Sequence, residues 1–355
     1  MSAEAWEAVP NFSTARPERV AELARRAGTA LLDVHADQGH GRSVVTLAST
    51  SLNKLCERLF ALIEYAVEYL DLSAEGGVHP RVGVADVVPL VALKGDPAAG
   101  VEAAHGLGHR LNQELGLPIY FYALASPGAS PTSLADVRHG RVPPDLPGRG
   151  APPGAGASCL GVRPPLVAYN VSSPALDPAL ARAAVLSLRR LPGVQALALG
   201  DQVSMNLTRP DLVGMGLARS TVNSIVPGPL IEELVGLCPA SAAVSPAADG
   251  ALLESRLAAH AGRNLAPTLG AANPDLAGAL EEWAITLERT GASPLAMIEA
   301  AERVAWLTSR ALDLGSGGCN WMGGLEFALS GLLDAVQKFG DPTLGPRLAR
   351  LRGAG

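Results

Sequence analysis

The stretch EGGVHPRVGVAD, residues 75–86, places a histidine and an arginine at the start of an apolar run. Histidine exchanges protons near neutral pH, and arginine binds carboxylates through two parallel hydrogen bonds. Gly76 and Gly77 would let the backbone approach a ligand closely. The pattern indicates His79 as a general acid–base group and Arg81 as a carboxylate-binding group. The alternative is an ordinary loop in which both residues are structural.

A second polar cluster, DVHADQGHGR, covers residues 33–42. Asp33, His35 and Asp37 alternate along the end of a predicted strand, and His40 and Arg42 follow in a turn. Such a mixture of ligand types is compatible with a metal site, but its spacing matches no established ligand geometry. We therefore predict no metal site.

Composition excludes several classes of protein. A net charge of −6 without a Lys/Arg cluster argues against nucleic-acid binding. No apolar run reaches the roughly 18–20 residues of a membrane-spanning helix. The N-terminal sequence MSAEAWEAVPNFS does not have the pattern of a secretory signal. The cysteines at 56, 159, 238 and 319 lack C-x-x-C spacing. We expect a cytoplasmic protein with free thiols.

The first part of the chain alternates between strands and helices. Apolar spacing predicts strands over 8–12, 30–37, 42–49, 82–93 and 117–125, and helices over 15–28, 51–73 and 98–116. This order, with its additions, contains the β-α-β-β-α-β pattern of a ferredoxin-like unit. Residues 141–158, rich in Pro, Gly and Ala, predict a loop that links two units or covers a ligand.

The same alternation then starts again. Strands are predicted over 165–173, 194–201, 202–209 and 233–239, and helices over 177–191 and 211–225. From about residue 241 the chain is rich in Ala and Leu, with amphipathic helices predicted over 249–262, 275–291, 293–315 and 323–340. We predict an α+β fold of two ferredoxin-like subdomains, 1–146 and 147–262, followed by a helical extension, 263–355.

Several motifs together resemble the formiminotransferase family. They are VPNFS at 9–13, DQGHGRSVVTL at 37–47, HPRVGVADVVPLV at 79–91, LGLPIYFYALA at 115–125 and GVRPPLVAYNV at 161–171. The resemblance spans about residues 7–262. It implies two ferredoxin-like subdomains that face each other across a cleft. It also implies transfer of a formimino group from N-formimino-L-glutamate to tetrahydrofolate, with a role in histidine degradation and one-carbon metabolism.

The resemblance also implies roles for particular residues. The family's catalytic histidine corresponds to His79, and its turn carboxylate and arginine correspond to Asp37 and Arg42. The loop that holds folate corresponds to residues 148–157, including Gly156 and Ala157. One imidazole could take a proton from one nitrogen and return it to the leaving amine. Asp37 or Asp86 could orient that imidazole.

Both substrates carry carboxylates, so cations are expected in the site. The candidates are Arg42, Arg81 and Arg163, with Lys94 a weaker one. Tetrahydrofolate, the acceptor, is the expected cofactor. We expect no partner beyond small molecules, except that a homodimer is compatible with the sequence.

Two other hypotheses remain open. Val78 stands where the family has an acidic residue, Gly41 stands where it has Asn, and the folate loop has no aromatic residue. These changes are compatible with a catalytically degenerate folate-binding or regulatory homologue. Alternatively, the helical extension is the main functional part, as a module for oligomerisation or partner docking.

Overall fold

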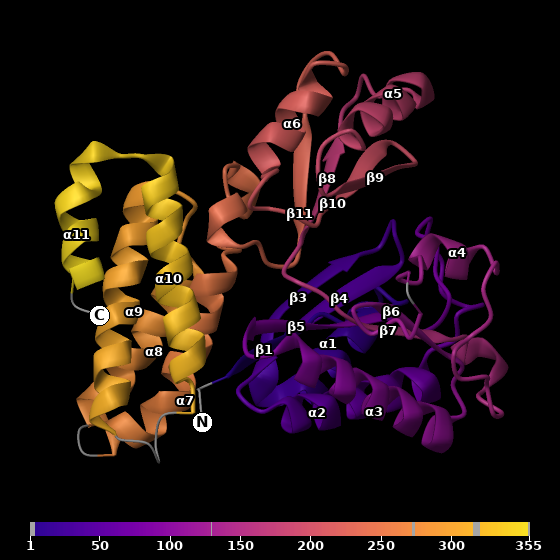
Figure 1. The fold of residues 1–355 in the computed structure, drawn as a ribbon, viewed down its shortest axis with the longest axis horizontal. Coiled ribbons are helices and arrows are strands. Elements are labelled where there is room, and N and C mark those ends of the chain that lie inside the picture. The colour runs from indigo at the N-terminus through magenta and orange to yellow at the C-terminus, as the bar shows by residue number, and fades with distance from the viewer. Residues whose placement is uncertain (1–3, 129, 272–273, 315–319, 354–355) are drawn as a thin grey trace. The chain divides into compact units, whose positions relative to one another are not determined.

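The computed structural model describes residues 4–128, 130–271, 274–314 and 320–353. Helices and strands are mixed, and the C-terminal region is helical, so the predicted α+β class is confirmed (Figure 1). The chain divides into two compact units, one ending at Pro164 and the other beginning at Pro165. Cys319 lies outside the described residues.

The first unit is built on a mixed sheet. Its strands are β1 (Ala5–Ala8), β2 (Asn11–Phe12), β3 (Leu31–Asp37), β4 (Arg42–Ser49), β5 (Ala85–Lys94), β6 (Ile119–Ala123) and β7 (Ser158–Val162). Strands β1 and β2 follow one another between β4 and β5, and both pair antiparallel with these neighbours. Strand β3 pairs with β4, and β7 lies parallel between β5 and β6. The two strands predicted over 30–37 and 42–49 are therefore present and form an antiparallel pair.

Three helices cover one face of this sheet: α1 (Pro17–Ala27), α2 (Leu52–Tyr69) and α3 (Pro97–Leu115) (Figure 1). Ser51 caps α2 by accepting from the Lys54 N–H, and Asp96 caps α3 in the same way with Pro97 at its first position. Between helices and sheet lies a core that includes fully buried Trp6 and Phe12. Burial of apolar side chains in this core is the main driving force for folding of the unit.

The opposite face of the sheet carries Val87, Tyr122 and Cys159, with the short helix α4 (Leu134–Arg138) packed on it. Strand β5 is irregular at this point. Asn11 pairs with Val87 but Phe12 pairs with Ala85, so Asp86 is an extra, unpaired residue. A bulge of this type re-aims a side chain, and such bulges are frequent beside active sites.

Strand β7 was not predicted, because its sequence, SCLGV, follows a Pro/Gly-rich stretch and is short. It pairs with β5 and β6 on both sides, and all five of its residues are buried. Residues 147–164 therefore belong to the first unit, and the two units divide at 164/165 rather than at the predicted 146/147. The three predicted domains themselves stay a prediction.

The second unit begins with a four-stranded antiparallel sheet. Its strands are β8 (Val167–Ser172), β9 (Val194–Leu199), β10 (Gln202–Leu207) and β11 (Ile231–Val235), in the order β11-β8-β10-β9. Helix α5 (Pro178–Leu188), capped by Asp177, and helix α6 (Met215–Asn223) connect them. The succession β-α-β-β-α-β is the predicted one. In chain order, β11, β8, β10 and β9 are the fourth, first, third and second strands of the succession. The corresponding strands of the first unit lie side by side in the same order, as β5, β1/β2, β4 and β3.

The C-terminal helices are α7 (Leu253–Gly270), α8 (Pro274–Glu288), α9 (Pro294–Asp313), α10 (Met322–Phe339) and α11 (Gly345–Gly353). Ser293 caps α9 through the Ala296 N–H, as its sequence indicates. Helix α7 continues past the predicted end at 262, and α11 was not predicted. Among the described helices, none is both long enough and apolar enough to cross a bilayer.

Candidate functional site

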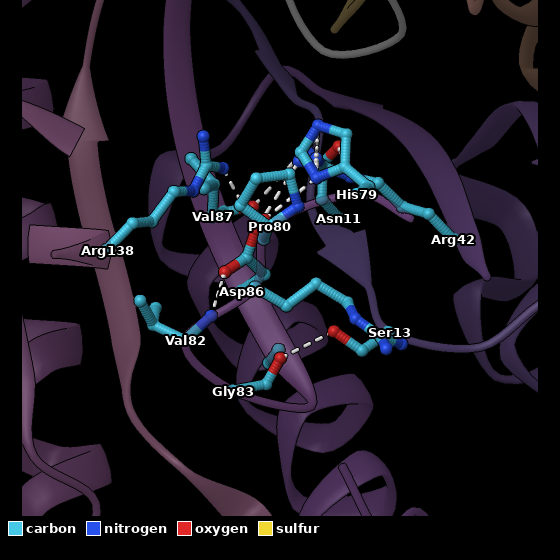
Figure 2. Close-up of polar contacts among 12 residues, drawn as sticks. Asn11, Ser13, Arg42, His79, Pro80, Val82, Gly83, Asp86, Val87 and Arg138 are labelled. Atoms are coloured by element: carbon cyan, nitrogen blue, oxygen red, sulfur yellow. Dashed lines mark hydrogen bonds and ion pairs between the residues drawn. The ribbon is translucent and has the colours of Figure 1, made fainter. Parts of the chain in front are cut away.

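His79 lies in the loop before β5 and contacts Arg42, the first residue of β4 (Figure 2). The Arg42 Nη1 is 2.7 Å from Nδ1 of the imidazole and 2.6 Å from Nε2. The Nδ1 is also 2.8 Å from the carbonyl oxygen of Pro80. Because a carbonyl only accepts, the consistent arrangement has Nδ1–H donating to Pro80. The Arg42 Nη1 is nearly equidistant from the two ring nitrogens, so it lies against the imidazole rather than along the Nε2 lone pair.

This environment keeps the imidazole neutral. Burial, together with the positive charges of Arg42 and Arg138, lowers the pKa of His79 to about 3, while the Pro80 carbonyl opposes the shift. At neutral pH, His79 is thus a neutral imidazole in contact with a cation.

Arg42 is anchored on the sheet face opposite the three helices. Its Nε donates to Asn11 Oδ1 at 2.9 Å, and its Nη2 is 3.6 Å from Asp86 Oδ2. The side chain is only 15% exposed. Burial lowers the pKa of Arg42 to about 10, with Asp86 opposing the shift and Arg138 adding to it. The guanidinium therefore remains charged at neutral pH, and an anion beside it would gain a strong interaction.

Asp86, at the bulge, links this arginine to another. Its Oδ2 accepts from Arg138 Nη2 at 3.2 Å, and its Oδ1 accepts from the Val82 N–H at 2.8 Å (Figure 2). The carboxylate is 1% exposed. One buried negative charge thus faces two guanidinium groups, which leaves the cluster with a net positive charge.

Two glycines allow the loops that carry His79 and Arg42 to meet. Gly41, with φ +61°, lies so close to the Gly76 carbonyl that a Cβ would be 1.7 Å from its oxygen. Gly77, with φ +125°, packs equally tightly on the His40 carbonyl. Because any side chain at 41 or 77 would push the loops apart, this contact depends on glycine.

Asp37 and Arg81 lie beside this pair and mainly hold the loops. Asp37 Oδ1 accepts from the His40 N–H at 3.0 Å, and Asp37 Oδ2 contacts the His40 ring. The His40 ring centroid is 6.2 Å from that of His79, in an edge-on arrangement. Arg81 donates to the carbonyls of Glu75 and Gly41, at 2.8 and 3.4 Å. In this arrangement, the Arg81 guanidinium bonds backbone carbonyls rather than a side-chain carboxylate.

The predicted folate loop runs along the segment that follows Arg81. The Ala157 N–H donates to Val82 O, and the Val84 N–H donates to Ala155 O, both at 2.9 Å. Gly156, with φ +67°, forms a β-bridge with Gly83. The loop containing Gly156 and Ala157 is therefore next in space to the loop containing His79.

Arg163 directly follows β7 and lies farther along the same sheet face. Its Nη1 donates to the Pro164 carbonyl at 3.0 Å. It is close to buried Tyr122, whose pKa is raised to about 12 by burial while the charges of Arg163 and Arg42 oppose that rise. It is also the main charge near Glu7, a 5% exposed carboxyl whose pKa burial raises to about 7.

Three of these residues had no sequence signal. Arg138 is the last residue of the five-residue helix α4, which is too short for apolar periodicity to predict. Tyr122 and Glu7 occupy strands that read as apolar, and only the pleat puts them on the site face. Within the described residues, no group of three His, Cys, Asp or Glu side chains could hold a metal ion.

The sequence of this chain is similar to those of known proteins. Residues 5–146 match the model of the formiminotransferase domain, N-terminal subdomain. A glutamate formimidoyltransferase of Thermoplasma acidophilum is 34% identical over 280 residues, which cover 68% of this chain and 90% of that protein. The chain belongs to the formiminotransferase family, whose members are transferases.

Other relatives match a shorter stretch. A glutamate formimidoyltransferase of Streptococcus pyogenes is 35% identical over 184 residues, which cover 47% of this chain and 61% of that protein. The formimidoyltransferase-cyclodeaminase of Gallus gallus is 35% identical over 184 residues, 47% of this chain and 34% of that protein. The chain thus matches only about a third of the length of this larger protein.

Proposed function

We propose that this chain transfers the formimino group of N-formimino-L-glutamate to N5 of tetrahydrofolate, giving glutamate and 5-formiminotetrahydrofolate. The observation that carries this proposal is the neutral His79 imidazole held against Arg42, in a cluster where Asp86 faces two arginines. The names of the relatives, glutamate formimidoyltransferases, support the reaction type.

The arrangement suggests how the proton moves. The Arg42 guanidinium lies against the His79 imidazole. A substrate carboxylate would draw the guanidinium toward itself and would add a negative charge that raises the imidazole pKa. His79 would then take the proton from the attacking N5 nitrogen and return it to the leaving glutamate nitrogen as the tetrahedral intermediate collapses.

The other predicted residues have supporting roles in this proposal. Asp37 fixes the turn through His40, and Arg81 fixes the loop that carries His79. Gly156 and Ala157 would lie along the acceptor, since their segment pairs with residues 82–84. A role in histidine degradation and one-carbon metabolism, and a cytoplasmic location, are part of the same proposal.

A folate-binding homologue without turnover is the second candidate. The low pKa of His79, about 3, favours it, because such a weak base is poorly suited to proton transfer unless the substrate changes its surroundings.

One assay separates the two. Purified protein is incubated with formiminoglutamate and tetrahydrofolate, and the 5,10-methenyl product is measured by its absorbance after acid treatment. Turnover supports the transferase. Folate binding in a thermal-shift titration without turnover supports the second candidate. If the protein shows no turnover and binds no folate, both candidates are contradicted.

A further inference from the structure

The sheet face that carries Arg42 also holds a second polar group, formed by Tyr122 and Arg163. Strand β6 places Tyr122 opposite Gly161 of β7, and the ring lies directly over that glycine. A Cβ at 161 would be 2.4 Å from Cε1 of the ring, so only glycine lets the phenol lie across β7 toward β5. Tyr122 is 7% exposed, and its hydroxyl stays protonated at neutral pH because burial raises its pKa.

Two cations lie near the phenol. The charges of Arg163 and Arg42 both act on Tyr122, Arg163 also through a hydrogen bond, and Arg163 also acts on the buried carboxyl of Glu7. Glu7 pairs with Val91 of β5, and the Arg163 N–H donates to Leu90 O at 3.1 Å, so the two residues flank the same part of β5. A phenol donor beside a guanidinium is suited to a carboxylate.

The two polar groups lie at a defined separation along β5. Asn11, which accepts from Arg42, pairs with Val87, while Tyr122 is in line with Gly161 and Pro89. Two residues of a strand correspond to about 7 Å. In formiminoglutamate, as in glutarate, four bonds separate the two carboxyl carbons, which is about 5 Å along an extended chain, and the carboxylate oxygens add about 1 Å at each end.

We propose that Tyr122 and Arg163 bind the side-chain carboxylate of the formimino donor, while Arg42 binds its α-carboxylate next to His79. The distance between this pair and Arg42 then acts as a length gauge, which selects a dicarboxylate of five carbons. This inference rests on the proposed function for the identity of the donor, but the gauge itself can be tested without turnover.

Binding of simple acids to the full chain tests it, with thermal shift and calorimetry as readouts. We expect glutarate to bind more tightly than succinate, adipate or pentanoate, the last being a five-carbon acid with one carboxylate. Tyr122→Phe and Arg163→Gln should each weaken glutarate about tenfold or more, because a hydrogen bond to a charged group is lost, and should leave pentanoate unchanged.

Tyr120→Phe is the matched control, since Tyr120 lies on the same face of β6 two residues away. Gly161→Ala is a second test, because it displaces the Tyr122 ring and keeps its hydroxyl; it should also abolish the preference for glutarate. The inference is overturned if the wild type binds all four acids alike, or if Tyr122→Phe behaves like Tyr120→Phe. A protein that selects glutarate but does not turn over would refute only the proposed reaction.

Discussion

The imidazole of His79 is the group whose chemistry depends most on its neighbours. It is neutral because it is partly buried beside two guanidinium groups, one of which contacts the ring. Adding a negative charge near Arg42 reverses the electrostatic part of this effect. The resting site is therefore an unreactive form that a substrate anion would activate.

This gives a pH-dependent prediction. Formiminoglutamate should raise the pKa of His79 from about 3 toward its ordinary value of 6.5. Histidine signals followed by NMR from pH 3 to pH 8, with and without the donor, measure the shift, and the spectrum of His79→Gln identifies the signal. A His79 pKa that does not change when the donor saturates the protein would exclude this activation.

Asp86 is the negative charge that holds the two arginines in place. Asp86→Asn removes one partner of a buried ion pair, for which a loss of roughly 3–5 kcal/mol is typical, and denaturant unfolding measures it. The matched control is Asp136→Asn, which breaks the exposed pair with Arg141, side chains 40% and 63% exposed; that change should be within about 1 kcal/mol. Equal effects at both positions would mean that Asp86 does not organise the cluster.

At the scale of elements, the site depends on two loops in contact. The turn after β3 carries Arg42, and the loop before β5 carries His79; the glycines at 41 and 77 let their backbones meet. The bulge at Asp86 adds the carboxylate between them. The two glycines and the bulge interrupt the regular strands and turns, and these interruptions bring the charged groups together.

The loop contact predicts the outcome of a pair of substitutions. Gly77→Ala should sharply reduce transfer activity, because its Cβ would lie 2.2 Å from the His40 carbonyl oxygen and its φ of +125° disfavours any side chain. Gly76→Ala, one residue earlier, has no atom within 4 Å of the added Cβ and should keep near wild-type activity. Steady-state kinetics and melting temperature of both proteins test this. Similar activities would contradict the role of the contact.

Most of the secondary structure could be predicted from the sequence. Periodicity located most strands and helices, since apolar positions repeat where a face is buried. Strand β7 escaped because SCLGV is short and buried on both sides, so it does not alternate. His79 and Arg42 were predicted from motifs, but their contact was not, because it depends on turn geometry. The contact of Arg138 could not be predicted, since no local pattern shows that the end of a short helix meets a bulge 52 residues earlier.

At the scale of the molecule, the position of β7 decides where the first unit ends. It is an inner strand, between β5 and β6, although it follows the Pro/Gly-rich stretch. A chain cut at the predicted boundary of 146 would lose it, and both neighbours would become open edges. The first unit has its own core and should need all residues to 164.

Two fragments test this prediction. We expect residues 1–164 to fold cooperatively, with a sigmoidal thermal transition by circular dichroism, and residues 1–146 to be unfolded or aggregated. Gel filtration of each fragment is the second readout. Cooperative folding of the shorter fragment would show that β7 is dispensable for the sheet.

The catalytic role of His79 is the central claim, and a comparison of kcat/KM for formiminoglutamate tests it most directly. His79→Gln is set against His109→Gln, a change at an exposed position of α3, with both proteins confirmed to be folded. The account predicts a loss of ~10²–10⁴-fold for His79→Gln and no change for His109→Gln. If His79→Gln keeps the full kcat/KM of the wild type, the claim is contradicted.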